Sequence, residues 1–307
     1  MVRLFRNYGA VVISMVFWSL AFIWFKIANE VYSPLTIIYM RLVISAMLLS
    51  LFLFTTRKFE KIERKDRKIF FLLAFCEPFI YFLGESFGLT YVSSIEGAVL
   101  ISTIPIFTAI ISWIFFKEKL RLINYAGIML SFVGVMIFVL NRDGSLSFDL
   151  RGLALLSVAV FGAVGYTLTL KRLADSYSPV FIVNVQNIIG LILFTPVILI
   201  FDLDNMARFS YSSVQFWAII KLALFASSGA FILFGYAVRS LGATKANVFS
   251  NAIPVFTAIF AFFLVGDVIT LQKITGMAIV VTGLFLSQSH KKEWSKPDGT
   301  ILAGKTG

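Results

Sequence analysis

Three ionisable side chains interrupt apolar segments in the first third of the chain. Arg41 lies within the segment 34–54, and Glu77 and Glu85 lie within the segment 69–91. A charged group is costly in hydrocarbon, so such residues face the protein interior and bind a solute, move a proton or pair with each other. Arg41 and Glu85 lie at similar depth on consecutive segments. We predict an Arg41–Glu85 pair, which either locks the two segments together or serves binding; the remaining alternative is that they do not touch.

Glu77 lies deeper in its segment and directly precedes Pro78. A carboxylate that is buried without a cation favours its protonated form and can carry a proton near neutral pH. Glu77 is therefore a candidate for proton coupling, a role for which Glu85 is also considered. Alternatively, Glu77 stays neutral and bonds backbone carbonyls that Pro78 leaves free.

Amide and aromatic side chains supply further candidates. Gln186 occupies the position that corresponds to Arg41 in the second half, and Asn247 and Asn251 lie one turn apart. Amides in such segments either line a cavity or bond neighbouring helices, and aromatic walls suit apolar, aromatic or quaternary-ammonium solutes. The predicted substrate-binding residues are Trp18, Tyr39, Arg41, Tyr81, Glu85, Phe107, Tyr166, Gln186, Asn187, Asn251 and Phe256.

The elements that must position these residues are apolar helices. Apolar residues make up 59% of the chain and charged residues only 14%, too few to cover the surface of a soluble domain. With about 20 residues per span, the chain accommodates about ten transmembrane helices. We predict them at 8–29, 34–54, 69–91, 95–116, 122–140, 151–173, 179–201, 215–238, 244–266 and 272–289.

The distribution of basic residues predicts the orientation. Arg57, Lys58 and Lys61 begin a strongly basic connection that extends to residue 68, whereas the connection 29–33 has no basic residue. Basic loops stay on the cytoplasmic side of a membrane. We therefore expect both termini in the cytoplasm.

An internal repeat links the two halves. The segment Ile104–Ile110 (IPIFTAI) recurs as Ile253–Ile259 (IPVFTAI), and at the same offset Glu118 corresponds to Asp267. We assign a first five-helix repeat to 1–143, a second to 144–289 and a polar tail to 290–307. A unit with an odd number of spans must be inverted when it is repeated, as in carriers that work by alternating access. The matched residues Pro105 and Pro254 are candidate hinges.

These features resemble the drug/metabolite transporter superfamily, in its EamA-type branch. The resemblance rests on the pattern of spans, the Pro-Ile/Val-Phe-Thr-Ala stretches at Pro105 and Pro254, Glu118 and Arg41, and it covers about residues 8–289. Each motif is loose, but their ordered recurrence in both halves is specific. The resemblance implies an all-α integral membrane fold of two inverted five-helix repeats around a central cavity. Members mostly export amino acids and other small metabolites, and some import them.

The predicted function is secondary active transport of a small-molecule substrate, an amino acid or related metabolite, out of the cell across the inner (cytoplasmic) membrane. The alternatives are an importer or channel for a small organic solute, or a membrane scaffold without transport. Besides the substrate and the lipid bilayer, a coupling proton is an expected partner. The protein is either a monomer or a homodimer with a second copy of the chain. One Cys and one His cannot form a metal site. We expect no cofactor, no catalytic residues and no nucleic-acid partner, because the basic residues occupy short loops.

Overall fold

The computed structural model describes residues 2–116, 121–139, 149–207, 210–265 and 270–287, and the regular structure in these ranges is helical. Eight helical segments are long and apolar enough to cross a membrane: Tyr8–Asn29, Pro34–Thr55, Arg67–Tyr91, Ser94–Ile111, Leu150–Ala174, Pro179–Phe201, Ser213–Leu241 and Ala243–Leu264. Two shorter apolar helices are Leu122–Gly134 and Ile274–Ser287. All-helical structure is thus confirmed, and the count of ten spans stays a prediction. Glu118, Asp267, the boundary at 143 and 144, and the tail 290–307 lie outside the described residues.

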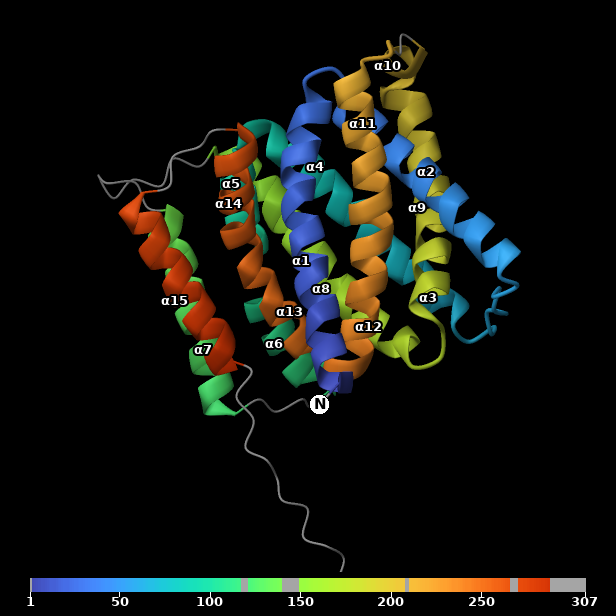
Figure 1. Ribbon diagram of the computed structural model, residues 1–307. Coiled ribbons are helices and arrows are strands. Elements are labelled where there is room, and N and C mark those ends of the chain that lie inside the picture. Colours follow the sequence, from blue (N-terminus) through green and yellow to red (C-terminus); the bar gives the residue numbers. More distant parts are fainter. Residues whose placement is uncertain (1, 117–120, 140–148, 208–209, 266–269, 288–307) are drawn as a thin grey trace, which may run out of the picture.

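The elements follow the predicted segments, several of which are divided. The first half contains α1 (Val2–Asn29), α2 (Pro34–Thr55), α3 (Arg67–Ala74), η1 (Phe75–Ile80), α4 (Tyr81–Tyr91), α5 (Ser94–Ile101), α6 (Ile104–Phe116) and α7 (Leu122–Val139). The second contains α8 (Leu150–Ala174), α9 (Pro179–Phe201), α10 (Leu203–Ala207), α11 (Ser213–Lys221), η2 (Leu222–Ala230), α12 (Phe231–Leu241), α13 (Ala243–Val248), η3 (Phe249–Ala252), α14 (Ile253–Val265) and α15 (Leu271–Ser287). Figure 1 shows α7 and α15 side by side at one edge of the bundle, with α2 and α9 at the other.

Matched sequence signals start α2 and α9. Each helix has Pro at its first position, where no intrahelical N–H is needed. The preceding serine caps each helix: Ser33 Oγ accepts from the Thr36 amide at 3.1 Å, and Ser178 Oγ accepts from the Phe181 amide at 3.4 Å. The Tyr-Ser-Pro sequence therefore fixes the same turn twice.

The central helices are irregular at corresponding places. Both η1 and η2 are π-helical, and Glu77 within η1 has non-helical backbone angles (φ −152°, ψ 120°). Before Pro105 the helix is interrupted at Ser102 and Thr103, and before Pro254 lies the 3₁₀ segment η3. Irregular backbone at membrane depth persists only where protein or a cavity surrounds it. The helix breaks beside both prolines are observed, and their role as hinges stays a prediction.

Glycines bring α7 and α15 into backbone contact. A Cβ on Gly127 would lie 2.8 Å from the Gly283 carbonyl oxygen, and a Cβ on Gly134 would lie 2.9 Å from the Gly276 carbonyl oxygen. The two helices therefore run antiparallel. In the repeat, Gly127 corresponds to Gly276 and Gly134 to Gly283, so one contact becomes the other when the halves are exchanged. Such exchange of partners is the signature of a two-fold relation.

Gly84 provides a test of this close packing at the contact between α4 and α8. A Cβ at Gly84 would lie 2.5 Å from the Leu155 carbonyl oxygen and 2.8 Å from the Ala159 amide nitrogen, whereas a Cβ at Gly9 would meet nothing within 4 Å. We expect Gly84→Ala to lower stability by about 1–3 kcal/mol through overpacking. The matched control Gly9→Ala should be neutral or gain up to ~1 kcal/mol from helix propensity. Thermal unfolding in detergent measures both, and equal midpoints for the two variants would contradict the packing argument.

Candidate substrate-binding site

A buried cavity of about 30 Å³ lies where the irregular segments meet. Glu77 of η1 contributes to its wall, and Ile101 and Ile104 flank the interruption between α5 and α6. Ser250 of η3 and Ile253 close another side. The volume accommodates roughly two water molecules, at about 10–15 Å³ each. The helix breaks thus border a small space whose lining is mostly apolar and includes a few polar groups.

Four of the residues predicted for binding or coupling line this cavity: Trp18, Glu77, Tyr81 and Tyr166. Phe231 of α12 supports two of them, because Trp18 and Tyr166 pack edge-on against its ring at centroid distances of 5.3 Å and 5.5 Å. Such T-shaped pairs stabilise their geometry beyond the area that they bury. The aromatic side of the cavity is therefore held in place by a second layer of aromatic residues.

Glu77 enters the cavity without a partner. Its side chain is 5% exposed, and in the described part of the chain its carboxylate has no hydrogen bond or ion pair. The alternative in which Glu77 bonds carbonyls freed by Pro78 is therefore not what the structure shows. A buried carboxylate with no partner is held at a considerable energetic cost, which favours binding of a proton or a cation.

Arg41 does not form the predicted direct ion pair with Glu85. Its Nε donates to Ser227 Oγ of η2 at 2.8 Å, and its Cζ lies 3.8 Å from the centroid of the Phe82 ring. The Glu85 carboxylate instead accepts from the Tyr81 hydroxyl at 2.8 Å. Glu85 is still the acidic group that acts most strongly on Arg41, ahead of Glu77. The charge of Arg41 is therefore offset by nearby carboxylates rather than by a direct ion pair with Glu85.

Gln186 and Tyr166 form a second unsatisfied group. Both are almost completely buried, and neither the Gln186 carboxamide nor the Tyr166 hydroxyl makes a well-formed hydrogen bond, although the two adjoin each other. Buried polar groups without partners are rare in native proteins and call for a functional or structural reason. Gln186 corresponds to Arg41 by the repeat, so both halves place a long polar side chain beside a π-helical segment.

Asn187 serves packing between helices. Its Nδ2 donates to Ser45 Oγ at 2.7 Å and to the Ser227 carbonyl at 3.3 Å. Ser45 and Ser228 hydroxyls also bond at 2.6 Å. This network joins α2, α9 and η2, and it holds the Ser227 that receives Arg41.

The structure does not bring four other predicted binding residues to the cavity. The Tyr39 hydroxyl faces Thr195 of α9, and Phe107 packs on Phe161 of α8. Phe256 lines an apolar groove between α1 and α15, and Asn251 donates to Ser131 of α7. Asn251 diverges from Asn247 because the intervening η3 winds at three residues per turn, so that i and i+4 no longer share a face.

Several cavity residues were not predicted. They are Phe22, Thr167, Phe234 and Ser250. Asn247, for which lining a cavity was one of two alternatives, lines the cavity as well. Asn247 Nδ2 donates to Thr108 and Thr167 hydroxyls at 2.8 Å and 3.0 Å. Serine and threonine hydroxyls commonly bond their own helix carbonyl, so their types alone gave no signal. In the same described part of the chain, no group of three His, Cys, Asp or Glu side chains is placed to hold a metal ion.

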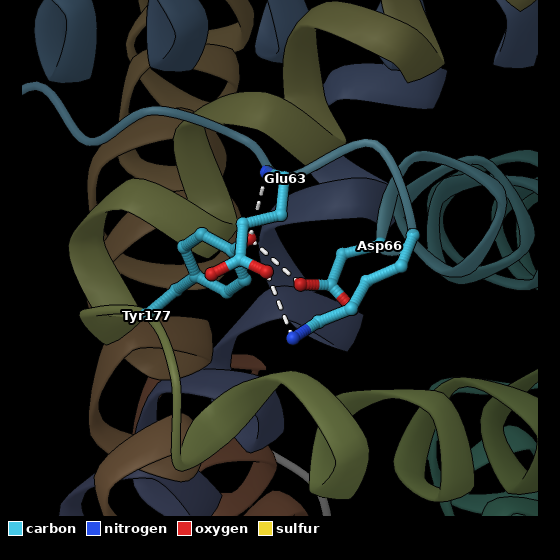
Figure 2. Close-up of polar contacts among 4 residues, drawn as sticks. Glu63, Asp66 and Tyr177 are labelled. Carbon is cyan, nitrogen blue, oxygen red and sulfur yellow. Dashed lines mark hydrogen bonds and ion pairs between the residues drawn. The ribbon is translucent and has the colours of Figure 1, made fainter.

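Two tyrosines from the repeated Tyr-Ser-Pro turns hold the loop that precedes the central span of the other half. Tyr177 accepts from the Glu63 amide at 3.1 Å and donates to Asp66 Oδ2 at 2.8 Å (Figure 2). Tyr32 accepts from the Ser212 amide, also at 3.1 Å, and donates to the Ser210 carbonyl. Burial raises the pKa of Tyr177, so its hydroxyl keeps the proton that it donates. We call these contacts the tyrosine latches.

Comparison with known proteins agrees with the fold. The EamA-like transporter family model matches residues 7–140 and again 150–288. An uncharacterized transporter of Archaeoglobus fulgidus is 26% identical over 92% of this chain and 98% of its own length. The uncharacterized transporter YetK of Bacillus subtilis is 28% identical over 83% of this chain and 78% of its own. A solved crystal structure shares the fold, with a TM-score of 0.73 at 13% identity over 92% of this chain and 96% of that one.

The helices and these relatives define the class of protein as a multi-pass membrane transporter. The chain belongs to the EamA-like transporter family, whose model matches both halves. The resemblance inferred from the repeated proline motif and Arg41 is thereby confirmed.

The balance between Arg41 and Glu85 can be measured by a double-mutant cycle. Arg41→Gln should destabilise the protein strongly, because it leaves Glu85 without its balancing charge. We expect the Arg41→Gln and Glu85→Gln changes to be non-additive, with a coupling of about 0.5–3 kcal/mol in thermal unfolding. Arg41→Lys should not restore the stability that Arg41→Gln loses, because lysine lacks both the Nε donor and the planar group that stacks on Phe82. Additive single changes would show that the two charges do not interact.

Proposed function

We propose that the protein is a secondary active transporter that moves small organic metabolites by alternating access. The observation that carries this proposal is the enclosed cavity, whose walls include Glu77 without a partner and the matched helix breaks. A buried carboxylate between hinged helices can bind a proton or a solute and pass it on when the helices move. The chemistry of the site is that of reversible binding rather than of bond formation.

We further propose that the chain consists of two inverted five-helix repeats. Supporting this are contacts that exchange partners between the halves: Gly127 with Gly283 and Gly134 with Gly276. The tyrosine latches follow the same rule, because Tyr177 receives the Glu63 amide and Tyr32 the Ser212 amide. A pseudo-two-fold arrangement gives a carrier two states of similar energy that open to opposite sides.

The latches suit the role of gates. The turn between α1 and α2, which holds Tyr32, and the turn between α8 and α9, which holds Tyr177, lie at opposite ends of the bundle (Figure 1). Both latches are formed in this structure and the cavity is small, which fits a state closed at both ends. Transport would break one latch at a time.

Orientation and direction complete the proposal. The basic connection that begins at Arg57 lies at the same end as Tyr177, and positive-inside logic places that end in the cytoplasm. The α1 N-terminus lies at this end too (Figure 1). We propose an inner-membrane exporter of amino-acid-sized metabolites with cytoplasmic termini, driven by proton entry through Glu77. An importer, a channel and a scaffold are the outcomes that the next experiments separate from it.

Glu77→Gln tests the coupling. In proteoliposomes, an inward proton gradient should drive solute export by the unaltered protein, and counterflow should saturate. The variant cannot exchange a proton, so we expect it to retain counterflow and lose the response to the gradient. Glu30→Gln is the control, because Glu30 is an exposed carboxylate outside the cavity. An unchanged response in Glu77→Gln would overturn proton coupling there, non-saturating flux would indicate a channel, and absence of all flux a scaffold.

Phenylalanine substitutions test the gates separately. Tyr177→Phe removes the hydroxyl that binds Glu63 and Asp66, and Tyr32→Phe removes the one that binds Ser210 and Ser212. In a Cys76→Ser, Ser250→Cys background, we expect the first change to speed labelling of the cavity cysteine by an impermeant thiol reagent from the cytoplasmic side. The second should speed labelling from the outer side. Equal changes from both sides in inside-out and right-side-out vesicles would contradict paired gates.

A further inference from the structure

The charge of the cavity points to the class of its ligand. Among the described residues that line it, Glu77 is the only acidic one, and none is Lys, Arg or His. The nearby guanidinium of Arg41 is engaged with Ser227 and with the face of Phe82, and Glu85 is held by Tyr81. Two carboxylates, Glu77 and Glu85, stand against the single cation Arg41, so this part of the bundle has one more acidic than basic group.

The walls around Glu77 suit a cation. Trp18, Phe22, Tyr81, Tyr166 and Phe234 line the cavity, and aromatic faces attract ammonium groups, most strongly where water is excluded. The buried Tyr166 hydroxyl makes no well-formed hydrogen bond and adjoins the Gln186 carboxamide, so its oxygen can turn to accept from an entering ammonium group. A carboxylate, a hydroxyl acceptor and aromatic faces are the features by which an organic ammonium group is bound.

Apart from the Tyr166 hydroxyl, the same walls offer few donors to a carboxylate. Asn247 Nδ2 already donates to two threonines. The hydroxyls of Thr167, Ser250 and Tyr81 donate to Ala163, Asn247 and Glu85. An entering carboxylate would therefore lack these donors and would face the charge of Glu77, and like charges in a desolvated site cost several kcal/mol.

Resting on the proposed transport function, we infer that this cavity binds the ammonium group of a small organic amine without a carboxylate, in preference to an amino acid. The ammonium group lies against Glu77 and the Tyr166 hydroxyl, with Trp18 and Phe234 beside it. A volume of about 30 Å³ matches one such group. The apolar remainder of the amine occupies the space that opens when a latch is released.

Matched pairs of ligands test this assignment. The full chain, purified in detergent, is titrated with isobutylamine against valine and with 2-phenylethylamine against phenylalanine, and the thermal midpoint is followed. We expect a saturable rise with the amines, and binding of the amino acids weaker by on the order of a hundredfold. Glu77→Gln should weaken amine binding several-fold without abolishing it, so that counterflow persists at saturating amine, and Glu30→Gln should leave the affinity unchanged. Amino acids that bind as tightly as their amines would overturn the inference.

A second variant keeps the test decisive if Glu77→Gln folds poorly. Tyr166→Phe removes only the unpartnered hydroxyl, so the fold should persist, and we expect amine affinity to fall several-fold. Unchanged amine affinity in Tyr166→Phe would contradict the proposed position of the ammonium group. The two proposals fail in different ways. Amine binding without counterflow in proteoliposomes refutes transport alone, whereas Glu77-dependent, proton-driven flux of an amino acid with no amine binding refutes the ligand class alone.

Discussion

Every backbone N–H and C=O group inside a membrane must find its partner within the protein, because hydrocarbon supplies none. This constraint accounts for the helical structure and also for where helices are allowed to break. The breaks at Glu77, at Ser102 and in η3 all lie at the cavity, where neighbouring helices cover the freed groups. The site therefore lies beside three of the helix irregularities in the described part of the bundle, while the π-helical η2 packs against α1 and α2.

Close packing lets the bundle enclose that irregular centre. Gly84 brings α4 against the backbone of α8 near Ala159, and Ser14 of α1 bonds the Ala230 carbonyl of η2. Small residues thus draw the first helix of each half onto the irregular central span of the other. Without apolar driving force between helices in lipid, such contacts and interhelical hydrogen bonds are what hold the halves together. The cavity is consequently built from both halves, and neither half alone could form it.

The sequence was informative about helices and charges and less so about faces. Apolar length predicted the helical segments, and the cost of burying Glu77, Arg41 and Gln186 predicted that they lie inside. The direction in which a side chain points around its helix axis, however, depends on how that helix crosses its neighbours. Tyr39 therefore contacts α9, and Phe107 contacts α8. Local winding matters as well. The 3₁₀ turn of η3 separates Asn247 from Asn251, and the π-helical η2 presents Ser227 to Arg41 in place of Glu85.

The two halves share matched motifs and matched contacts, but their chemistry differs. Arg41 and Gln186 occupy corresponding positions, yet one is charged and bonded to Ser227 while the other is neutral and unsatisfied. A carrier that opens to two sides needs its two states close in energy, which matched packing and matched latches supply. Under the proposed mechanism both states would use the same central site, so the ionisable groups need not be duplicated in the second half. The placement of Glu77, Glu85 and Arg41 in the first half is what such a shared site predicts, because the cavity itself is lined by residues of both halves.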